Sequence, residues 1–284
     1  MTHSAQNTQV TTLSSQRIQL KHFGIPVRCW SGRTGKPSPG AHFHRLARLP
    51  THGPEPYELR SMTFLDAMRR SRLLAILRGV QARELPLVAE ACNRTGLGWV
   101  EITLNTNEAL SKIASLRDLS KGNFEVGAGT VLSAHQAREA VAAGARFVIA
   151  PVLDLEVARA ARDLGVPYIP GALTPHEVWS AYQAGATMVK LFPARCFGPS
   201  YVQELRGPFG EIPFLGCGGI RQDNLREYLD AGVDAVALGA SVFRRDWLAA
   251  GNLTALLDAL GTLIAIVHSF EAERATQTGR HCPP

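Results

Sequence analysis

The stretch EVGAGTVLSAHQAREAVAAGARFVIA, residues 125–150, contains two short apolar runs separated by one helical pattern. The runs, at 125–131 and 147–150, have the length and composition of buried β-strands. Between them, Ser133 is a typical helix N-cap and Gly144 a typical helix stop. The stretch therefore predicts one strand–helix–strand unit of a parallel sheet.

The same α/β unit repeats along most of the chain. Further apolar runs bring the total to eight, each about 20–27 residues after the last, and they lie at 73–77, 99–104, 167–170, 188–192, 213–217 and 235–239. Asp154 and Asp223 are N-cap candidates, and Thr174 with Glu177 forms a capping box. Eight units favour a (β/α)8 TIM barrel. The alternative, an open doubly wound sheet, is disfavoured because no dinucleotide-binding GxGxxG opens the first unit. The helix expected at 63–72 could close the barrel bottom.

The N-terminal part differs in composition from the rest. Residues 1–60 hold eight Lys/Arg and two acids, which gives 8 − 2 = +6, the net charge of the whole chain; the remainder balances at 22 − 22 = 0. The charge therefore gives the folded part no general attraction for nucleic acid. Three interpretations stay open: coding sequence mis-assigned upstream of a true start at Met62, a disordered basic tail, or a transit peptide. The expected domains are the extension at 1–61, the barrel at 62–271 and a C-terminal tail at 272–284.

Cysteine usage and hydropathy indicate the compartment. The five cysteines are scattered and form no CxxC pair, which argues against a disulfide framework or a zinc site and favours free thiols in a reducing compartment. No uninterrupted apolar run approaches the ~18 residues of a membrane span, and no apolar signal-peptide segment is visible. We therefore expect a cytoplasmic protein without a metal and without a membrane partner.

Three polar residues lie where a barrel places its active groups, at the carboxyl ends of strands. Lys190 lies between Val189 and Leu191, and burial there favours the neutral amine, which is a nucleophile. Glu101 is a buried acid that could move protons beside such an amine. Arg78 ends the first strand and could bind a carboxylate through two hydrogen bonds. The structural alternatives are a snorkelling Lys190, a purely structural ion pair for Glu101 and a surface location for Arg78. A buried lysine and a buried glutamate that both lie near strand ends make the first two alternatives less favoured than a shared catalytic role.

Small residues follow the last two strands, where barrels commonly bind phosphate through backbone N–H groups. They are Gly218 and Gly219 after the seventh strand, and Gly239, Ala240 and Ser241 after the eighth. The structural alternative is that they only form tight turns. Thr130 and Pro151 end the third and fourth strands and could line the pocket near the reacting carbon.

Most of these residues lie in motifs that resemble the 2-keto-3-deoxy-6-phosphogluconate / 2-keto-3-deoxy-6-phosphogalactonate aldolase family; Pro151 and the turn at 239–241 lie outside the motifs. The resemblance runs from about residue 74 to 270, and the motifs occur in the order and spacing of the family. They are AILRG (75–79), VEITLN (100–105), GAGTVL (127–132), PGALTPHE (170–177), KLFPA (190–194), FGPSYVQELRGPF (197–209) and GGI (218–220).

The resemblance implies a class I mechanism that needs no metal or cofactor, and a homotrimer of barrels. Lys190 matches the Schiff-base lysine and Glu101 the acid/base glutamate. The implied pocket for the pyruvate-derived end consists of Arg78, Thr130, Pro151 and Phe192. The implied phosphate site consists of Gly218, Gly219, Gly239, Ala240 and Ser241.

Two departures from the gluconate-type pattern favour the galactonate branch. Asn105 stands where gluconate-type enzymes often carry Arg, and Cys217 stands where many carry a Thr whose hydroxyl could contact the C4 hydroxyl of the substrate. The two substrates differ at C4, so discrimination is expected there. The expected reaction is cleavage of 2-dehydro-3-deoxy-6-phosphogalactonate to pyruvate and glyceraldehyde 3-phosphate. The alternatives are the same reaction on the gluconate epimer, another phosphate-binding barrel enzyme such as an isomerase or synthase, and a non-catalytic sugar-phosphate binder.

Overall fold

One parallel sheet forms the centre of the computed structural model, which describes residues 63–278; the predicted extension at 1–61 lies outside these residues. The strands run in the order β5-β4-β3-β2-β1-β9-β8-β7-β6, and every pairing is parallel. Their bounds are β1 (Leu73–Leu77), β2 (Trp99–Thr103), β3 (Glu125–Gly129), β4 (Val148–Ile149), β5 (Tyr168–Ile169), β6 (Gly171–Ala172), β7 (Val189–Leu191), β8 (Phe214–Cys217) and β9 (Ala235–Leu238).

The sheet returns to itself because β5 and β6 are two halves of one segment, interrupted only by Pro170. β5 pairs with β4, and β6 pairs with β7. Proline has no N–H to donate to the ladder, so it divides the strand, but its carbonyl still accepts the backbone N–H of Lys190 at 2.8 Å. The predicted eight-stranded barrel is therefore confirmed, with its fifth strand divided and extended to Ala172.

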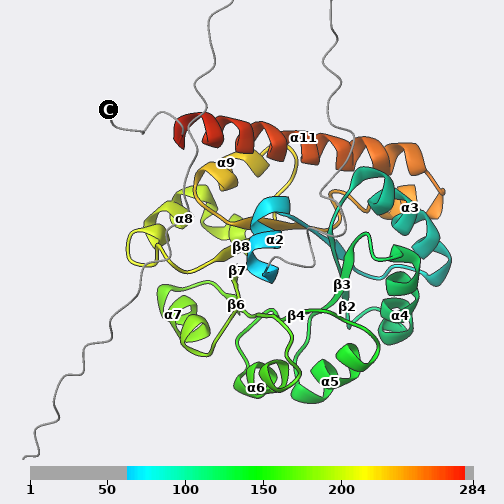
Figure 1. Cartoon of the computed structure of the whole chain (residues 1–284), viewed down its shortest axis with the longest axis horizontal. Coiled ribbons are helices and arrows are strands. Elements are labelled where there is room, and N and C mark those ends of the chain that lie inside the picture. Colours follow the sequence, from blue (N-terminus) through cyan, green and yellow to red (C-terminus); the bar gives the residue numbers. More distant parts are fainter. Residues whose placement is uncertain (1–62, 279–284) are drawn as a thin grey trace, which may run out of the picture. The chain divides into compact units, whose positions relative to one another are not determined.

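Helices surround the sheet, and α2 crosses its centre (Figure 1). Their bounds are α2 (Phe64–Ser71), α3 (Leu85–Thr95), α4 (Ala109–Ser120), α5 (Ala134–Ala142), α6 (Leu155–Asp163), α7 (Pro175–Gln183), α8 (Gly198–Arg206), α9 (Leu225–Asp230), α10 (Arg245–Ala249) and α11 (Leu253–Thr278), with single 3-10 turns η1 (Ala82–Glu84) and η2 (Ala194–Cys196).

The predicted helix starts are correct at three of four positions. Ser133 and Asp154 accept backbone N–H groups at the starts of α5 and α6, and Thr174 forms the capping box of α7. Asp223 was expected to cap α9, but this prediction is wrong. The residue before that helix is Asn224, while the Asp223 carboxylate pairs with the Arg221 side chain at 3.0 Å.

Helix α2 closes the amino-terminal end of the barrel, as its sequence position suggested. Ala67 and Met68 are buried in the interior cluster of the barrel. Phe64 packs against Trp99 and Phe147 with ring centroids 4.9 and 5.6 Å apart. Aromatic contacts of this kind add to the hydrophobic effect, so the bottom of the barrel is a packed plug.

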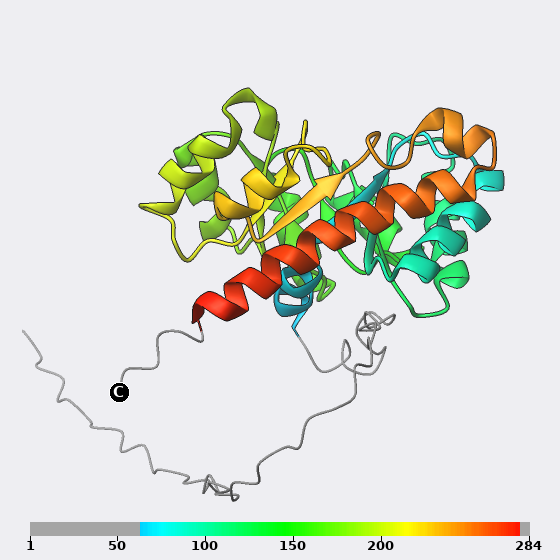
Figure 2. The same ribbon diagram turned by 90° about the horizontal axis from the view of Figure 1, so that it is seen from above.

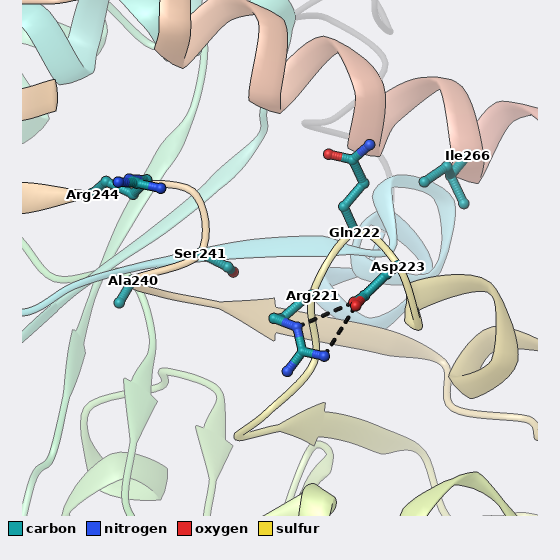
Figure 3. Close-up of a pocket in the computed structure, with 7 residues that line it drawn as sticks. All are labelled: Arg221, Gln222, Asp223, Ala240, Ser241, Arg244 and Ile266. Atoms are coloured by element: carbon teal, nitrogen blue, oxygen red, sulfur yellow. Dashed lines mark hydrogen bonds and ion pairs between the residues drawn. The ribbon is translucent and has the colours of Figure 1, made fainter.

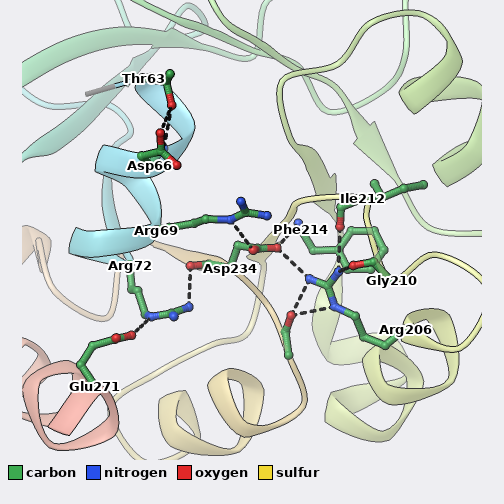
Figure 4. A network of polar contacts seen from close by, with 11 residues as sticks. Thr63, Asp66, Arg69, Arg72, Arg206, Gly210, Ile212, Phe214, Asp234 and Glu271 are labelled. Carbon is green, nitrogen blue, oxygen red and sulfur yellow. Dashed lines mark hydrogen bonds and ion pairs between the residues drawn. The ribbon is translucent and has the colours of Figure 1, made fainter. Parts of the chain in front are cut away.

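A polar network around Asp234 fastens this plug to the sheet (Figure 4). The carboxylate of Asp234 accepts Arg69 Nε at 2.8 Å, Arg206 Nη2 at 2.7 Å and the backbone N–H of Phe214 at 2.8 Å. The Asp234 carbonyl accepts Arg72 Nη1 at 3.0 Å. One residue thus joins α2, α8, β8 and the start of β9.

Replacing Asp234 with alanine is expected to lower the free energy of unfolding by roughly 2–4 kcal/mol, because three charge-assisted or backbone hydrogen bonds lose a mostly buried acceptor. Chemical denaturation measures this loss. Asp118→Ala is the matched control, since its pair with Arg117 is exposed and such pairs contribute about 0.5 kcal/mol or less. Equal stability of the two variants would contradict the assignment.

Helix α11 is the longest in the described part of the chain and lies along one side of the barrel (Figure 2). Its segment Leu253–Thr276 is long and apolar enough to cross a membrane by length and composition, with a mean hydropathy of 1.7 and 28% of the window buried. The buried stripe packs on the barrel core, and it consists of Leu256, Leu260, Leu263, Val267 and Phe270. The helix continues to Thr278, past residue 272, where the expected tail would begin.

Candidate active site

Lys190 is held at the middle of β7 with its side chain 6% exposed. Its backbone pairs with Gly171 on one side and Leu215 on the other. The ammonium nitrogen Nζ lies 5.3 Å from the ring centroid of Phe192, the first residue after the strand. The amine is thus enclosed in the barrel beside an aromatic ring, and it is close enough to Glu101 and Cys217 to act on them electrostatically.

Glu101 occupies the corresponding place on β2 and is 1% exposed. Burial raises the pKa of its carboxyl, and the positive charges of Lys190 and Arg78 oppose that rise. Its Oε2 has no hydrogen-bond partner among the described residues. A buried carboxylate oxygen without a partner is costly, and in a barrel mouth it is available to a substrate or to water.

Gly129, which was not among the residues predicted for the site, makes room for this carboxyl. A Cβ at Gly129 would lie 2.5 Å from Oε1 of Glu101, which is shorter than a van der Waals contact allows. The residue ends β3 and lies opposite Thr103 on β2. The GAGTV motif held the signal, because a glycine within a strand often marks a close approach by another group.

Gly129→Ala is expected to reduce turnover about 10²-fold, because a Cβ there forces the Glu101 carboxyl out of position by about an ångström. Steady-state kinetics at neutral pH measures the loss. Gly98→Ala is the matched control, since a Cβ there would meet no atom within 4 Å. Retention of wild-type turnover by Gly129→Ala would show that the carboxyl position is not critical.

Arg78 adds a positive charge near the pair, and Cys217 adds a neutral thiol. Arg78 follows β1, is exposed, and is close enough to influence both Glu101 and Cys217 electrostatically. Cys217 ends β8 and is buried within the barrel interior. Burial raises the pKa of its thiol, and the charge of Lys190 opposes the rise. The thiol therefore stays protonated beside Lys190.

The loops after β3 and β4 bring Thr130 and Pro151 to the same end of the barrel. Thr130 has φ 58°, a left-handed conformation that is unusual for a β-branched residue and occurs preferentially at functional sites. The Pro151 carbonyl lies against Gly171, where a Cβ would come within 2.0 Å of it. Both backbones are thus constrained around the barrel mouth.

The predicted phosphate residues form two turns on neighbouring strands. Gly218 and Gly219 follow β8 with φ 91° and 85°, values that glycine adopts readily. A Cβ at Gly218 would come 3.2 Å from the Phe192 ring. Gly239, Ala240 and Ser241 follow β9, which pairs with β8. The predicted binding residues therefore lie at or beyond the carboxyl ends of their strands, whereas Lys190 and Glu101 lie within β7 and β2.

A surface pocket of about 580 Å³ lies beside this site (Figure 3). It shares Ala240 and Ser241 with the predicted phosphate site but includes neither Lys190 nor Glu101. Its lining is Arg221, Gln222, Asp223, Ala240, Ser241, Arg244 and Ile266. Sequence reasoning did not find the two lining arginines, because they lie beyond the glycine turns and outside the quoted motifs.

The fold and the buried lysine–glutamate pair define an α/β-barrel enzyme of the aldolase type. The sequence profile described as "Aldolase: KDPG and KHG aldolase" matches residues 65–259. The chain belongs to this family, and it is an aldolase, a carbon–carbon lyase.

Known relatives support this assignment and include both substrate types. The 2-dehydro-3-deoxy-6-phosphogalactonate aldolase of Escherichia coli K12 is 33% identical over 173 residues, 61% of this chain and 84% of the relative. The 2-dehydro-3-deoxy-phosphogluconate aldolase of Pseudomonas aeruginosa is 36% identical over 162 residues, 57% of this chain and 73% of the relative. A structure of the Legionella pneumophila KDPG aldolase, with pyruvate captured as a covalent carbinolamine, has a TM-score of 0.66 at 26% identity and covers 71% of this chain and 98% of its own.

Proposed function

We propose that the chain is a class I aldolase that cleaves 2-dehydro-3-deoxy-6-phosphogalactonate to pyruvate and glyceraldehyde 3-phosphate, with Lys190 as the Schiff-base residue. The observation that carries the proposal is the burial of Lys190 and Glu101 within one barrel, close enough to interact electrostatically, with a Glu101 oxygen left without a partner among the described residues. The covalent carbinolamine in the Legionella relative supports the same chemistry.

Carbon–carbon cleavage follows from an imine on Lys190. The neutral amine attacks the C2 ketone, and loss of water from the carbinolamine gives an iminium. Glu101 moves the protons that these two steps require. Removal of the C4 hydroxyl proton breaks the C3–C4 bond, the bonding electrons pass to the iminium nitrogen, and glyceraldehyde 3-phosphate leaves. The enamine is then protonated at C3 and hydrolysed, which releases pyruvate and restores the amine.

The remaining groups of the site position the two ends of the substrate. The Arg78 guanidinium, close enough to act electrostatically on Glu101, would bind the C1 carboxylate. Thr130, Pro151 and Phe192 would enclose the carbon chain near Lys190. The turns at Gly218–Gly219 and Gly239–Ser241, on the paired strands β8 and β9, would hold the 6-phosphate.

Cys217 supports the galactonate assignment. It faces the barrel interior on a strand that pairs with β7, which carries Lys190. A thiol hydrogen-bonds more weakly than a hydroxyl, so this position gives little specific recognition of the gluconate C4 hydroxyl. The gluconate epimer remains the alternative substrate, because relatives of both types have similar identity.

A lactate-dehydrogenase-coupled assay of pyruvate release tests the substrate, with the two C4 epimers compared side by side. We expect a higher kcat/KM for the galactonate epimer, and Cys217→Thr is expected to shift the ratio toward the gluconate epimer by about tenfold, the effect of one hydrogen bond to substrate. Cys217→Val is the control without a hydroxyl. A wild-type preference for the gluconate epimer would reverse the assignment but retain the mechanism.

The same proposal includes a homotrimer in the cytoplasm. Val152, Leu155 and Trp179 are large apolar residues about half exposed around α6 and α7, and a neighbouring subunit would remove their apolar surface from water. Light scattering of the purified chain tests the trimer, and a monomer mass would contradict it.

A further inference from the structure

Arg195 follows the KLFPA motif directly and reaches the glycine turn after the neighbouring strand. It lies in η2, and its backbone N–H donates to the carbonyl of Gly218 at 2.9 Å. The loop after β7 is therefore fastened to the loop after β8 at the turn assigned above to the substrate phosphate.

The side chain of Arg195 then crosses the second glycine of that turn. A Cβ at Gly219 would come within 2.4 Å of Arg195 Cβ, 2.8 Å of Cδ and 3.0 Å of Cγ. The aliphatic part of the Arg195 side chain thus occupies the space that a side chain at residue 219 would need, and only glycine fits there. Since Nε is bonded to Cδ, the guanidinium lies next to the turn.

The charge of Arg195 is not neutralised within the part of the chain that the structure describes. The side chain is exposed and has neither a hydrogen bond nor an ion pair with a described residue. Its neighbours in the next two loops differ, because Arg221 pairs with Asp223 at 3.0 Å and Arg244 with Asp246 at 2.8 Å. Of these three loop arginines, Arg195 alone has its full set of donors available.

We propose that Arg195 is a specificity-determining residue that binds the phosphate of the substrate and makes the enzyme prefer phosphorylated keto-deoxy sugar acids over unphosphorylated keto acids. This inference rests on the proposed function. A guanidinium binds a phosphate through two parallel, charge-assisted hydrogen bonds. An unphosphorylated acid leaves this cation without a partner, so its cleavage gains nothing from Arg195.

Arg195→Gln separates this role from the chemistry at Lys190. We expect kcat/KM for the phosphorylated substrate to fall by about 10–100-fold, mainly through KM, which is the usual effect of losing a charge-assisted hydrogen bond. Exchange of the methyl protons of pyruvate in heavy water requires the imine but no phosphate, and its rate is expected to change by less than about twofold. Arg195→Lys keeps the charge without the fork geometry and is expected to retain an intermediate kcat/KM.

Arg138→Gln, an exposed arginine on α5, is the matched control and is expected to leave both rates unchanged. An Arg195→Gln enzyme whose kcat/KM for the phosphorylated substrate stays within about twofold of wild type would overturn the inference alone. A loss of pyruvate proton exchange equal to the loss of cleavage would also overturn it, because Arg195 would then support the whole site. A wild-type enzyme that neither exchanges pyruvate protons nor cleaves the sugar acid would overturn the proposed function and the inference together.

Discussion

Lys190→Ala is expected to abolish cleavage, with a loss on the order of 10⁵-fold, because no other group in the site can form the covalent imine. The coupled pyruvate assay measures this loss. Borohydride reduction in the presence of pyruvate should add one pyruvate-derived group to the wild-type chain at Lys190 and none to the variant. Mass spectrometry of the labelled peptide locates the group.

Two further variants distinguish loss of chemistry from loss of folding. Lys190→Arg keeps a cation in the barrel but cannot form an imine, so it is expected to be as inactive as Lys190→Ala. Lys121→Ala alters an exposed lysine after α4 and should retain full activity. Trapping of pyruvate on Lys190→Ala at the wild-type level would refute the Schiff-base assignment.

Glu101→Gln is expected to lower kcat by about 10²–10⁴-fold, the usual contribution of general acid–base catalysis. The amide keeps the size of the side chain but cannot carry a proton between substrate and water. Steady-state kinetics measures the loss. Because Lys190 is retained, borohydride trapping of pyruvate should still occur, only more slowly. Wild-type kcat in this variant would assign the proton transfers to another group.

The pH dependence of the wild-type enzyme should report the same residue. Burial raises the pKa of the Glu101 carboxyl, so its ionised form is lost at a higher pH than for an ordinary glutamate. Activity that needs the ionised base should therefore fall as the pH drops through this raised pKa. The acid limb of the kcat profile should be absent in Glu101→Gln.

The contribution of Glu101 to folding stability should change with pH in the opposite direction to its contribution to activity. A carboxyl whose pKa is higher in the folded state than in the unfolded state binds more protons when folded, so its contribution to stability is fully present below the unfolded pKa and is lost as pH rises through the folded pKa. Stability of wild type relative to Glu101→Gln should therefore decline across that interval. A difference that is constant with pH would contradict the raised pKa.

Most strands of the barrel could be predicted because the apolar runs in the sequence coincide with the buried strands of the structure. The apolar runs around 73–77 and 235–239, bounded by glycine or charged residues, became β1 and β9 within one residue. The division at Pro170 was not predicted, although proline cannot donate to a ladder. Asp223 is not the N-cap because α9 begins one residue later than expected, at Leu225, and its carboxylate pairs with Arg221 instead.

The burial of the two charged residues could be predicted from the sequence, whereas the close approaches of small residues could not. Lys190 and Glu101 stand out because a charge within an apolar strand is rare. Gly129 and Arg195 matter through close approaches to residues far away in the chain. A Cβ at Gly129 would lie 2.5 Å from Glu101 Oε1, and a Cβ at Gly219 would lie 2.4 Å from Arg195 Cβ. Such approaches depend on how neighbouring strands are packed, which periodicity alone does not fix.

The plug formed by α2 and Asp234 bears on how such an enzyme can acquire a new substrate. Its contacts lie at the amino-terminal ends of the strands, where Asp234 joins Arg69 and Arg206, whereas Cys217 and Arg195 lie at the carboxyl ends. Barrels commonly keep folding stability and chemistry at opposite faces in this way. Evolutionary or engineered changes at the carboxyl end can therefore alter substrate choice while the contacts that anchor the fold stay intact.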